Sequence, residues 1–270
     1  MLEKIKETIS YLYKQTDIQP VVGLVLGTGL GGLVNEIETG AEIRYQDIPN
    51  FPVSTVDGHE GKLIFGMLGG KKVVAMKGRF HYYEGWKMDE ITYPIRVMKF
   101  LGIQFLFLSN ASGGVNPDFE TGDLMIIEDH INLLPNPLIG KHYPEFGARF
   151  PDMNDTYSQE LIKKAEAIAE KLNIKIHKGI YTATTGPAFE TAAEYKYFRM
   201  IGSDAVGMST VPETIVAHQM GIRCFGISVI TDLGVPGKIE FTTHEHVQDV
   251  AKNSEKKMTL IIKDLIKALT

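Results

Sequence analysis

The chain has 270 residues, a net charge of −5 at neutral pH and a hydrophobic content of 44%. This length suffices for one large domain with a substantial core, and the mild acidity gives no argument for binding nucleic acid or an anionic membrane. The single cysteine, Cys224, excludes an internal disulfide, and its apolar neighbours predict a buried, unreactive thiol.

The beginning of the chain predicts a surface helix rather than a signal peptide. Leu2, Ile5 and Leu12 recur at helical spacing among lysines and glutamates. No apolar stretch approaches the roughly 20 residues of a membrane-spanning helix. We therefore expect a cytoplasmic protein without a membrane partner.

From residue 20 onward, apolar β-rich runs alternate with helical patterns. Strands are expected at 20–27, 63–68, 73–76, 103–109, 124–127, 176–183, 205–208 and 222–231, and helices at 88–101, 158–172 and 244–269. Pro94 predicts a break inside the first of these helices. The alternation predicts an α/β fold of one domain, residues 1–270, with a central mixed, largely parallel sheet flanked by helices.

In such folds ligands bind at the carboxyl ends of the strands. Polar and glycine-rich segments follow the expected strands at 27–29, 78–85, 110–114, 207–209 and 231–232. Their positions predict one composite site.

The first of these segments, Gly27–Gly32, follows a strand and opens a short helix. It matches the pattern G-x-G-x-x-G, and Asp47 lies about 20 residues on, as in dinucleotide-binding folds. An NAD-dependent oxidoreductase is therefore one interpretation. A phosphate held by backbone N–H groups and the Thr28 hydroxyl is a second, and a turn without a ligand is a third.

Two segments further along favour an anion site. The planar guanidinium of Arg79 suits phosphate oxygens, and His81 lies two residues on. Ser209 supplies a hydroxyl at another strand end. His59, in a loop between glycines, either reaches the same anion or faces solvent.

Other side chains suggest a sugar and a base. Tyr83 suits a sugar hydroxyl, although packing in the core is the alternative. Phe189 and Glu190 together suit stacking on a base and accepting hydrogen bonds from its edge, although an acid in the first turn of a helix is also common. The chain has neither the G-x-S-x-G nor the H-E-x-x-H pattern, which argues against a serine hydrolase and against a metal site.

Taken together, the motifs resemble those of the trimeric purine nucleoside phosphorylases, the family that also contains the methylthioadenosine phosphorylases. The resemblance runs nearly from end to end. It rests on Gly27-Thr28-Gly29-Leu30-Gly31, Gly58-His59-Glu60-Gly61, Gly78-Arg79-Phe80-His81-Tyr82-Tyr83-Glu84-Gly85, Asn110-Ala111-Ser112-Gly113-Gly114, Arg149-Phe150-Pro151-Asp152-Met153, Gly186-Pro187-Ala188-Phe189-Glu190-Thr191 and Val206-Gly207-Met208-Ser209-Thr210-Val211-Pro212-Glu213.

The resemblance implies a pentosyltransferase of purine salvage, a cytoplasmic homotrimer that needs no cofactor and uses inorganic phosphate as a co-substrate. It implies phosphate binding by Thr28, His59, Arg79, His81, the Ala111 backbone and Ser209, ribose binding by Tyr83, Met208 and His244, and purine binding by Phe189, Glu190, Val206 and Asp232. It also implies catalytic roles for His81, Glu190 and Asp232, and the donation of Phe146 to a neighbouring subunit's site.

Position 232 leaves the base preference open. Family members that act on inosine and guanosine usually carry Asn there, whereas methylthioadenosine phosphorylases carry Asp. An ionised Asp232 can only accept hydrogen bonds, which suits a 6-amino group. Glu190 instead suits N1–H and a 2-amino group, and His244 suits a 5′-hydroxyl. We expect a preference for inosine and guanosine, with Asp232 protonated because burial raises its pKa, and methylthioadenosine or adenosine as the alternative.

Overall fold

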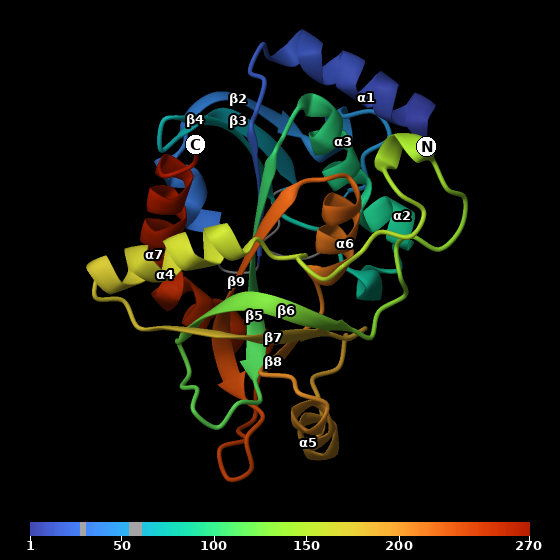
Figure 1. Ribbon diagram of the computed structural model, residues 1–270. Helices are drawn as coiled ribbons and strands as arrows, with labels where there is room; N and C mark the ends of the chain where they lie inside the picture. Colours follow the sequence, from blue (N-terminus) through green and yellow to red (C-terminus); the bar gives the residue numbers. More distant parts are fainter. Residues whose placement is uncertain (28–30, 54–60) are drawn as a thin grey trace.

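The computed structural model describes residues 1–27, 31–53 and 61–270 (Figure 1). The helices are α1 (Leu2–Gln15), α2 (Met88–Ile91), α3 (Tyr93–Leu101), α4 (Gln159–Lys171), α5 (Ala192–Met200), α6 (Val211–Gln219) and α7 (His244–Lys267). The strands are β1 (Val22–Leu26), β2 (Glu38–Arg44), β3 (Lys62–Leu68), β4 (Lys71–Lys77), β5 (Phe105–Gly114), β6 (Leu124–Asn132), β7 (Ile176–Ala183), β8 (Ala205–Gly207) and β9 (Arg223–Leu233). Short 3₁₀ helices are η1 (Gly31–Glu36), η2 (Tyr45–Asp47), η3 (Tyr82–Glu84) and η4 (Pro144–Phe146).

The strands form one mixed sheet in the order β2-β3-β4-β1-β5-β8-β7-β6-β9, with β9 also paired to β5. Because β5 pairs with both β8 and β9, the strands β5, β8, β7, β6 and β9 close into a ring. Figure 1 shows β6 and β7 running across β5 and β9. The pairs β1–β4, β1–β5, β5–β9, β6–β7 and β7–β8 are parallel, which confirms the expected mixed, largely parallel sheet.

Helices cover both faces of the sheet, so the central strands are apolar on both sides. Leu24 of β1 belongs to a core shared with α4 and α7, whereas the next residue, Val25, belongs to a core shared with α1, α3 and α6. Successive side chains of a strand point to opposite faces. Burial on both faces explains why β1 reads as a continuous apolar run rather than an alternating one.

The first and last helices are amphipathic. In α1, Ile5 and Leu12 are fully buried, as expected. In α7, Ile261 and Leu265 pack against the sheet while lysines face solvent. Within the described ranges, the length and apolar character that a bilayer crossing requires do not occur together in any helix.

Three local features differ from the sequence-based expectations. The helix after the glycine-rich turn is a single 3₁₀ segment, η1, and it is followed by the edge strand β2, which the sequence did not predict. The strand predicted at 103–109 continues to Gly114, so the segment 110–114 lies inside β5 rather than after it. Its register against β9 shifts between Ser112 and Gly113, a bulge of the kind that occurs beside functional sites.

The predicted break near Pro94 is confirmed, because α2 ends before Thr92 and α3 follows it.

Candidate active site

A cavity of about 330 Å³ lies where β5, β8 and β9 meet the segment after β4 and the start of α7. Its volume is in the range of small-molecule sites. It brings together segments that are far apart in the sequence, as the strand-end motifs predicted. Among the predicted residues, its lining includes Arg79, His81, Tyr83, Ala111, Phe189, Glu190, Val206, Met208, Ser209, Asp232 and His244.

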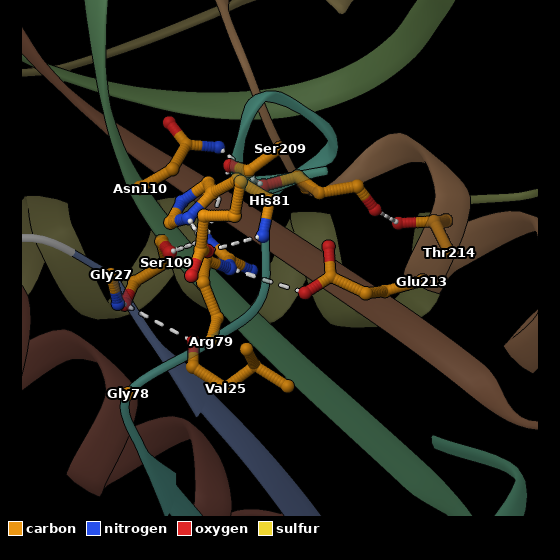
Figure 2. Close-up of polar contacts among 12 residues, drawn as sticks. Val25, Gly27, Gly78, Arg79, His81, Ser109, Asn110, Ser209, Glu213 and Thr214 are labelled. Atoms are coloured by element: carbon orange, nitrogen blue, oxygen red, sulfur yellow. Dashed lines mark hydrogen bonds and ion pairs between the residues drawn. The ribbon is translucent and has the colours of Figure 1, made fainter. Parts of the chain in front are cut away.

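A buried cation occupies one part of this lining (Figure 2). Directly after β4, Gly78 adopts a φ of 111°, a conformation that favours glycine, and the chain leaves the strand there. Arg79 follows and is 1% exposed. Its Nε donates to Glu213 Oε1 at 3.1 Å, and its Nη1 donates to Ser109 O at 2.7 Å and Ser209 Oγ at 3.2 Å. The guanidinium is thus fixed by three elements before any ligand arrives.

His81 is oriented by a neighbouring acid. Glu84 Oε1 accepts from the backbone N–H of His81 at 2.7 Å and lies 3.0 Å from its Nδ1. The ring stacks on Tyr83 with centroids 4.8 Å apart. Burial lowers the pKa of His81, an effect that the hydrogen bond to Glu84 opposes and the charge of Arg79 reinforces. A neutral imidazole whose Nδ1–H is donated to Glu84 keeps its Nε2 as the basic nitrogen.

The amino-terminal side of the cavity is set by a close approach of two strands. Gly27, which lines the cavity, donates from its N–H to Ser109 Oγ at 3.3 Å. A Cβ at this position would lie 2.7 Å from the Ser109 carbonyl oxygen, so β1 and β5 can approach here only because the residue is glycine. The predicted phosphate ligands Thr28 and His59 lie outside the described residues.

Two carboxyl groups form a second cluster. Glu190 lies directly before the N-cap residue of α5. Glu190 Oε1 accepts a hydrogen bond from Thr184 Oγ1 at 3.3 Å. On β9, Asp232 accepts from Thr231 Oγ1 at 3.0 Å and from the Tyr195 hydroxyl at 3.3 Å. Burial raises the pKa of Asp232, although both hydrogen bonds oppose it. Burial also raises the pKa of Glu190, and the charge of Asp232 adds to that rise.

The remaining lining residues supply apolar surface and polar groups that suit sugar hydroxyls. Val206 is buried on β8, and the Phe189 ring is 43% exposed at the cavity. Met208 follows β8. Burial, with the nearby Glu84 carboxylate, raises the pKa of Tyr83 to about 12, so its phenol stays protonated and able to donate. His244 begins α7, and its Nε2 lies 3.0 Å from the side-chain nitrogen of Gln248.

Phe146, predicted to reach a neighbouring subunit's site, does not line the cavity of its own chain. Its side chain is 4% exposed and packs inside its own chain, with the Arg96 guanidinium 4.2 Å above the ring and Phe100 in edge contact. The donation of this ring to a neighbouring subunit's site stays a prediction. Four residues further on, Phe150 is 88% exposed.

The structure gives no support to the dinucleotide interpretation of the glycine-rich turn. Asp47, the candidate ribose-binding acid, accepts from Arg44 Nε at 2.8 Å on the exposed edge of the molecule and does not line the cavity. The turn leads into a 3₁₀ helix of six residues rather than a full α-helix.

Sequence reasoning assigned no role to several residues that hold the site in place. Most of them lie inside the quoted motifs, but nothing in a single sequence shows which distant side chain each one contacts. They are Glu84, Asn110, Ser112, Tyr195, Glu213 and Thr231. In the ranges that the structure describes, no cluster of three or more His, Cys, Asp or Glu side chains has the arrangement of a metal site.

The arrangement offers a fixed cation with hydroxyl donors for an anion, and two protonatable carboxyl groups for a polar, planar ligand.

A family model described as the phosphorylase superfamily matches residues 21–267, so the chain belongs to that superfamily. Within it, the chain belongs with the purine nucleoside phosphorylases. It is 48% identical to purine nucleoside phosphorylase 1 of Bacillus subtilis, over 98% of each chain, and 42% identical to the purine nucleoside phosphorylase of Bos taurus, over 99% of this chain and 95% of the relative.

Solved structures agree with this placement. The structure of Schistosoma mansoni purine nucleoside phosphorylase in complex with adenosine is 39% identical to this chain, and the match covers 99% of this chain and 98% of that one, with a TM-score of 0.94. The structure of the schistosomal enzyme in complex with hypoxanthine gives the same identity, coverage and TM-score. These matches confirm the fold and the enzyme class, and they exclude the oxidoreductase interpretation. The roles of individual residues stay predictions.

Proposed function

We infer that this enzyme cleaves purine ribonucleosides and 2′-deoxyribonucleosides with inorganic phosphate, giving the free base and (deoxy)ribose 1-phosphate, with inosine and guanosine preferred. The observation that carries this proposal is the presence of both clusters in one cavity: a buried cation with hydroxyls, and a pair of protonatable carboxyl groups. The first suits the attacking phosphate and the second suits the departing purine.

On the phosphate side, Arg79, Ser209 and the backbone N–H of Ala111 would bind the anion, with Thr28 and His59 completing its shell. The neutral His81 would accept a proton from the phosphate through Nε2, which increases the negative charge on the attacking oxygens. Holding phosphate under the sugar converts a bimolecular attack on C1′ into an oriented one. No protein carboxylate is then needed as a nucleophile, in contrast to retaining glycosidases.

On the sugar side, Tyr83, Met208 and His244 would hold the ribose between the two clusters. The Tyr83 phenol donates a hydrogen bond to a sugar hydroxyl or accepts one from it, and His244 reaches the 5′-hydroxyl. As the glycosidic bond breaks, C1′ gains positive character directly above the bound anion. The anion therefore stabilises the transition state more than the ground state.

On the base side, the purine leaves with negative charge that must be stabilised. Phe189 and Val206 would sandwich the ring, Glu190 would accept from N1–H and the 2-amino group, and Asp232 would face O6 and N7. A neutral Asp232 donates one hydrogen bond and accepts another, as an amide does. These bonds strengthen as the base gains charge, which favours the transition state selectively.

A 6-aminopurine substrate is the second candidate, favoured by the acid at position 232. An ionised Asp232 would accept from a 6-amino group and repel O6. The Schistosoma mansoni relative was solved with adenosine, and its counterpart with hypoxanthine, so both base types enter sites of this fold in relatives. For this chain, Glu190 and the raised pKa of Asp232 support the 6-oxopurine.

The experiment is a phosphate-dependence assay over inosine, guanosine, adenosine and methylthioadenosine. We expect hypoxanthine release from inosine only with phosphate, and kcat/KM highest for inosine and guanosine. Glu190→Gln should lower kcat/KM for inosine by about 10²-fold, as for a lost transition-state contact, whereas Glu170→Gln on the exposed face of α4 should leave it unchanged. Base release without phosphate, or a preference for adenosine or methylthioadenosine, would contradict the proposal.

We further propose a cytoplasmic homotrimer that acts in purine salvage without a metal or organic cofactor. The family resemblance supports this assembly. Light scattering should give a mass three times the 30.0 kDa of the chain. A monomeric mass, or loss of activity after treatment with a chelator, would count against the proposal.

A further inference from the structure

The chain makes a sharply strained turn between β8 and α6. Thr210, at the centre of the turn, has φ 71° and ψ −49°, and Val211 N donates to Ser209 O across it at 2.8 Å. This is the rarer and more strained form of the γ-turn. The other two non-glycine residues with positive φ in the described ranges are asparagines, which tolerate it, whereas a β-branched residue there is an outlier.

The threonine hydroxyl is held from behind by a buried amide. Asn110 Nδ2 donates to Thr210 Oγ1 at 2.8 Å, and Ser228 Oγ donates to Asn110 Oδ1 at 2.5 Å. Thr210 and Ser228 are fully buried, and Asn110 is 2% exposed. The serine bond to Oδ1 fixes which end of the amide faces Thr210, so the threonine oxygen is an acceptor from that side.

The threonine proton then has one destination. Thr210 Oγ1 lies 3.1 Å from Ser209 Oγ, and the described residues offer it no other acceptor within hydrogen-bonding distance. Ser209 Oγ also accepts from Arg79 Nη1 at 3.2 Å. With both acceptor positions of Ser209 occupied, its own proton is directed away from Thr210 and Arg79, toward the cavity that Ser209 lines.

We propose that Thr210 is a positioning residue that orients the Ser209 hydroxyl as a hydrogen-bond donor to the bound phosphate. A glycine would adopt this turn more easily but would leave the Ser209 hydroxyl free to rotate. The strained threonine is therefore explained by the hydroxyl that only serine or threonine supplies here. The proposal rests on the proposed role of Ser209 in binding phosphate.

The test compares Thr210→Val, which keeps the shape and removes the hydroxyl, with Thr210→Ser, which keeps the hydroxyl. We expect the valine variant to raise KM for phosphate about tenfold, the effect of one lost hydrogen bond to a charged ligand, with KM for inosine changed less than about twofold. The serine variant should behave like the wild type. Thr210→Gly, which suits the positive φ, provides a second variant without the hydroxyl if the valine variant does not fold.

A double-mutant cycle with Ser209→Ala separates the two levels of the argument. If Thr210 acts through Ser209, adding Thr210→Val to Ser209→Ala should leave KM for phosphate unchanged. An equal effect in both backgrounds, or equal changes in KM for phosphate and for inosine, would overturn the positioning role. If Ser209→Ala alone leaves KM for phosphate unaltered, the assignment of the phosphate site fails instead.

Discussion

At the scale of single residues, we expect Asp232 to decide how the enzyme distinguishes purines. Burial raises the pKa of this carboxyl group above its ordinary value. Below its pKa in the fold, Asp232 is neutral and presents one donor and one acceptor. Above it, the ionised group only accepts, which disfavours O6 and favours a 6-amino group.

The ratio of kcat/KM for inosine to that for adenosine should therefore fall as the pH rises through the raised pKa of Asp232. In Asp232→Asn the side chain does not titrate, so the ratio should be high and independent of pH. The measurement is the pH profile of kcat/KM for both nucleosides at saturating phosphate.

Asp249→Asn, an exposed acid on α7, serves as the matched control and should keep the wild-type profile. A profile of the ratio that is the same in Asp232→Asn and in the wild type would show that another group sets the base preference.

At the scale of elements, strand cores could be predicted from the sequence but their ends could not. The apolar runs of β1 and β9 are buried on both faces, and such runs are distinctive. The polar, glycine-rich end of β5 has little strand propensity of its own. It becomes a strand because Gly113 and Gly114 pair with both β8 and β9, which are about 100 residues away in the sequence. The edge strand β2 has only one buried residue and gave no alternating pattern.

The same limit applies to the site. The motifs named the side chains that line the cavity, because Arg, His, Ser and Glu at strand ends suggest chemistry by their type alone. Their partners could not be predicted, because the Arg79–Glu213 pair joins residues 134 positions apart. In the same way, only the fold shows that the Arg96 guanidinium lies over the Phe146 ring.

At the scale of the whole molecule, we expect phosphate binding in the cavity to stabilise the fold. The groups that we propose to bind phosphate come from the segment after β4, from β5 and from the turn after β8, so a bound phosphate would link elements that unfolding separates. A ligand that binds only the folded state at 100 times its dissociation constant adds about 2.7 kcal/mol to the free energy of unfolding. For a chain of this size that corresponds to a rise in Tm of about 5–10 °C.

Phosphate without nucleoside should therefore raise Tm by this amount in a thermal melt at fixed protein concentration. The double variant Arg79→Met/Glu213→Gln removes the buried charge together with its counter-ion, so that neither is left unpaired. Its own Tm should hardly respond to phosphate. Arg44→Met, which removes an exposed arginine outside the cavity, should keep the full shift. An equal shift in the double variant would place the stabilising anion somewhere other than beside Arg79.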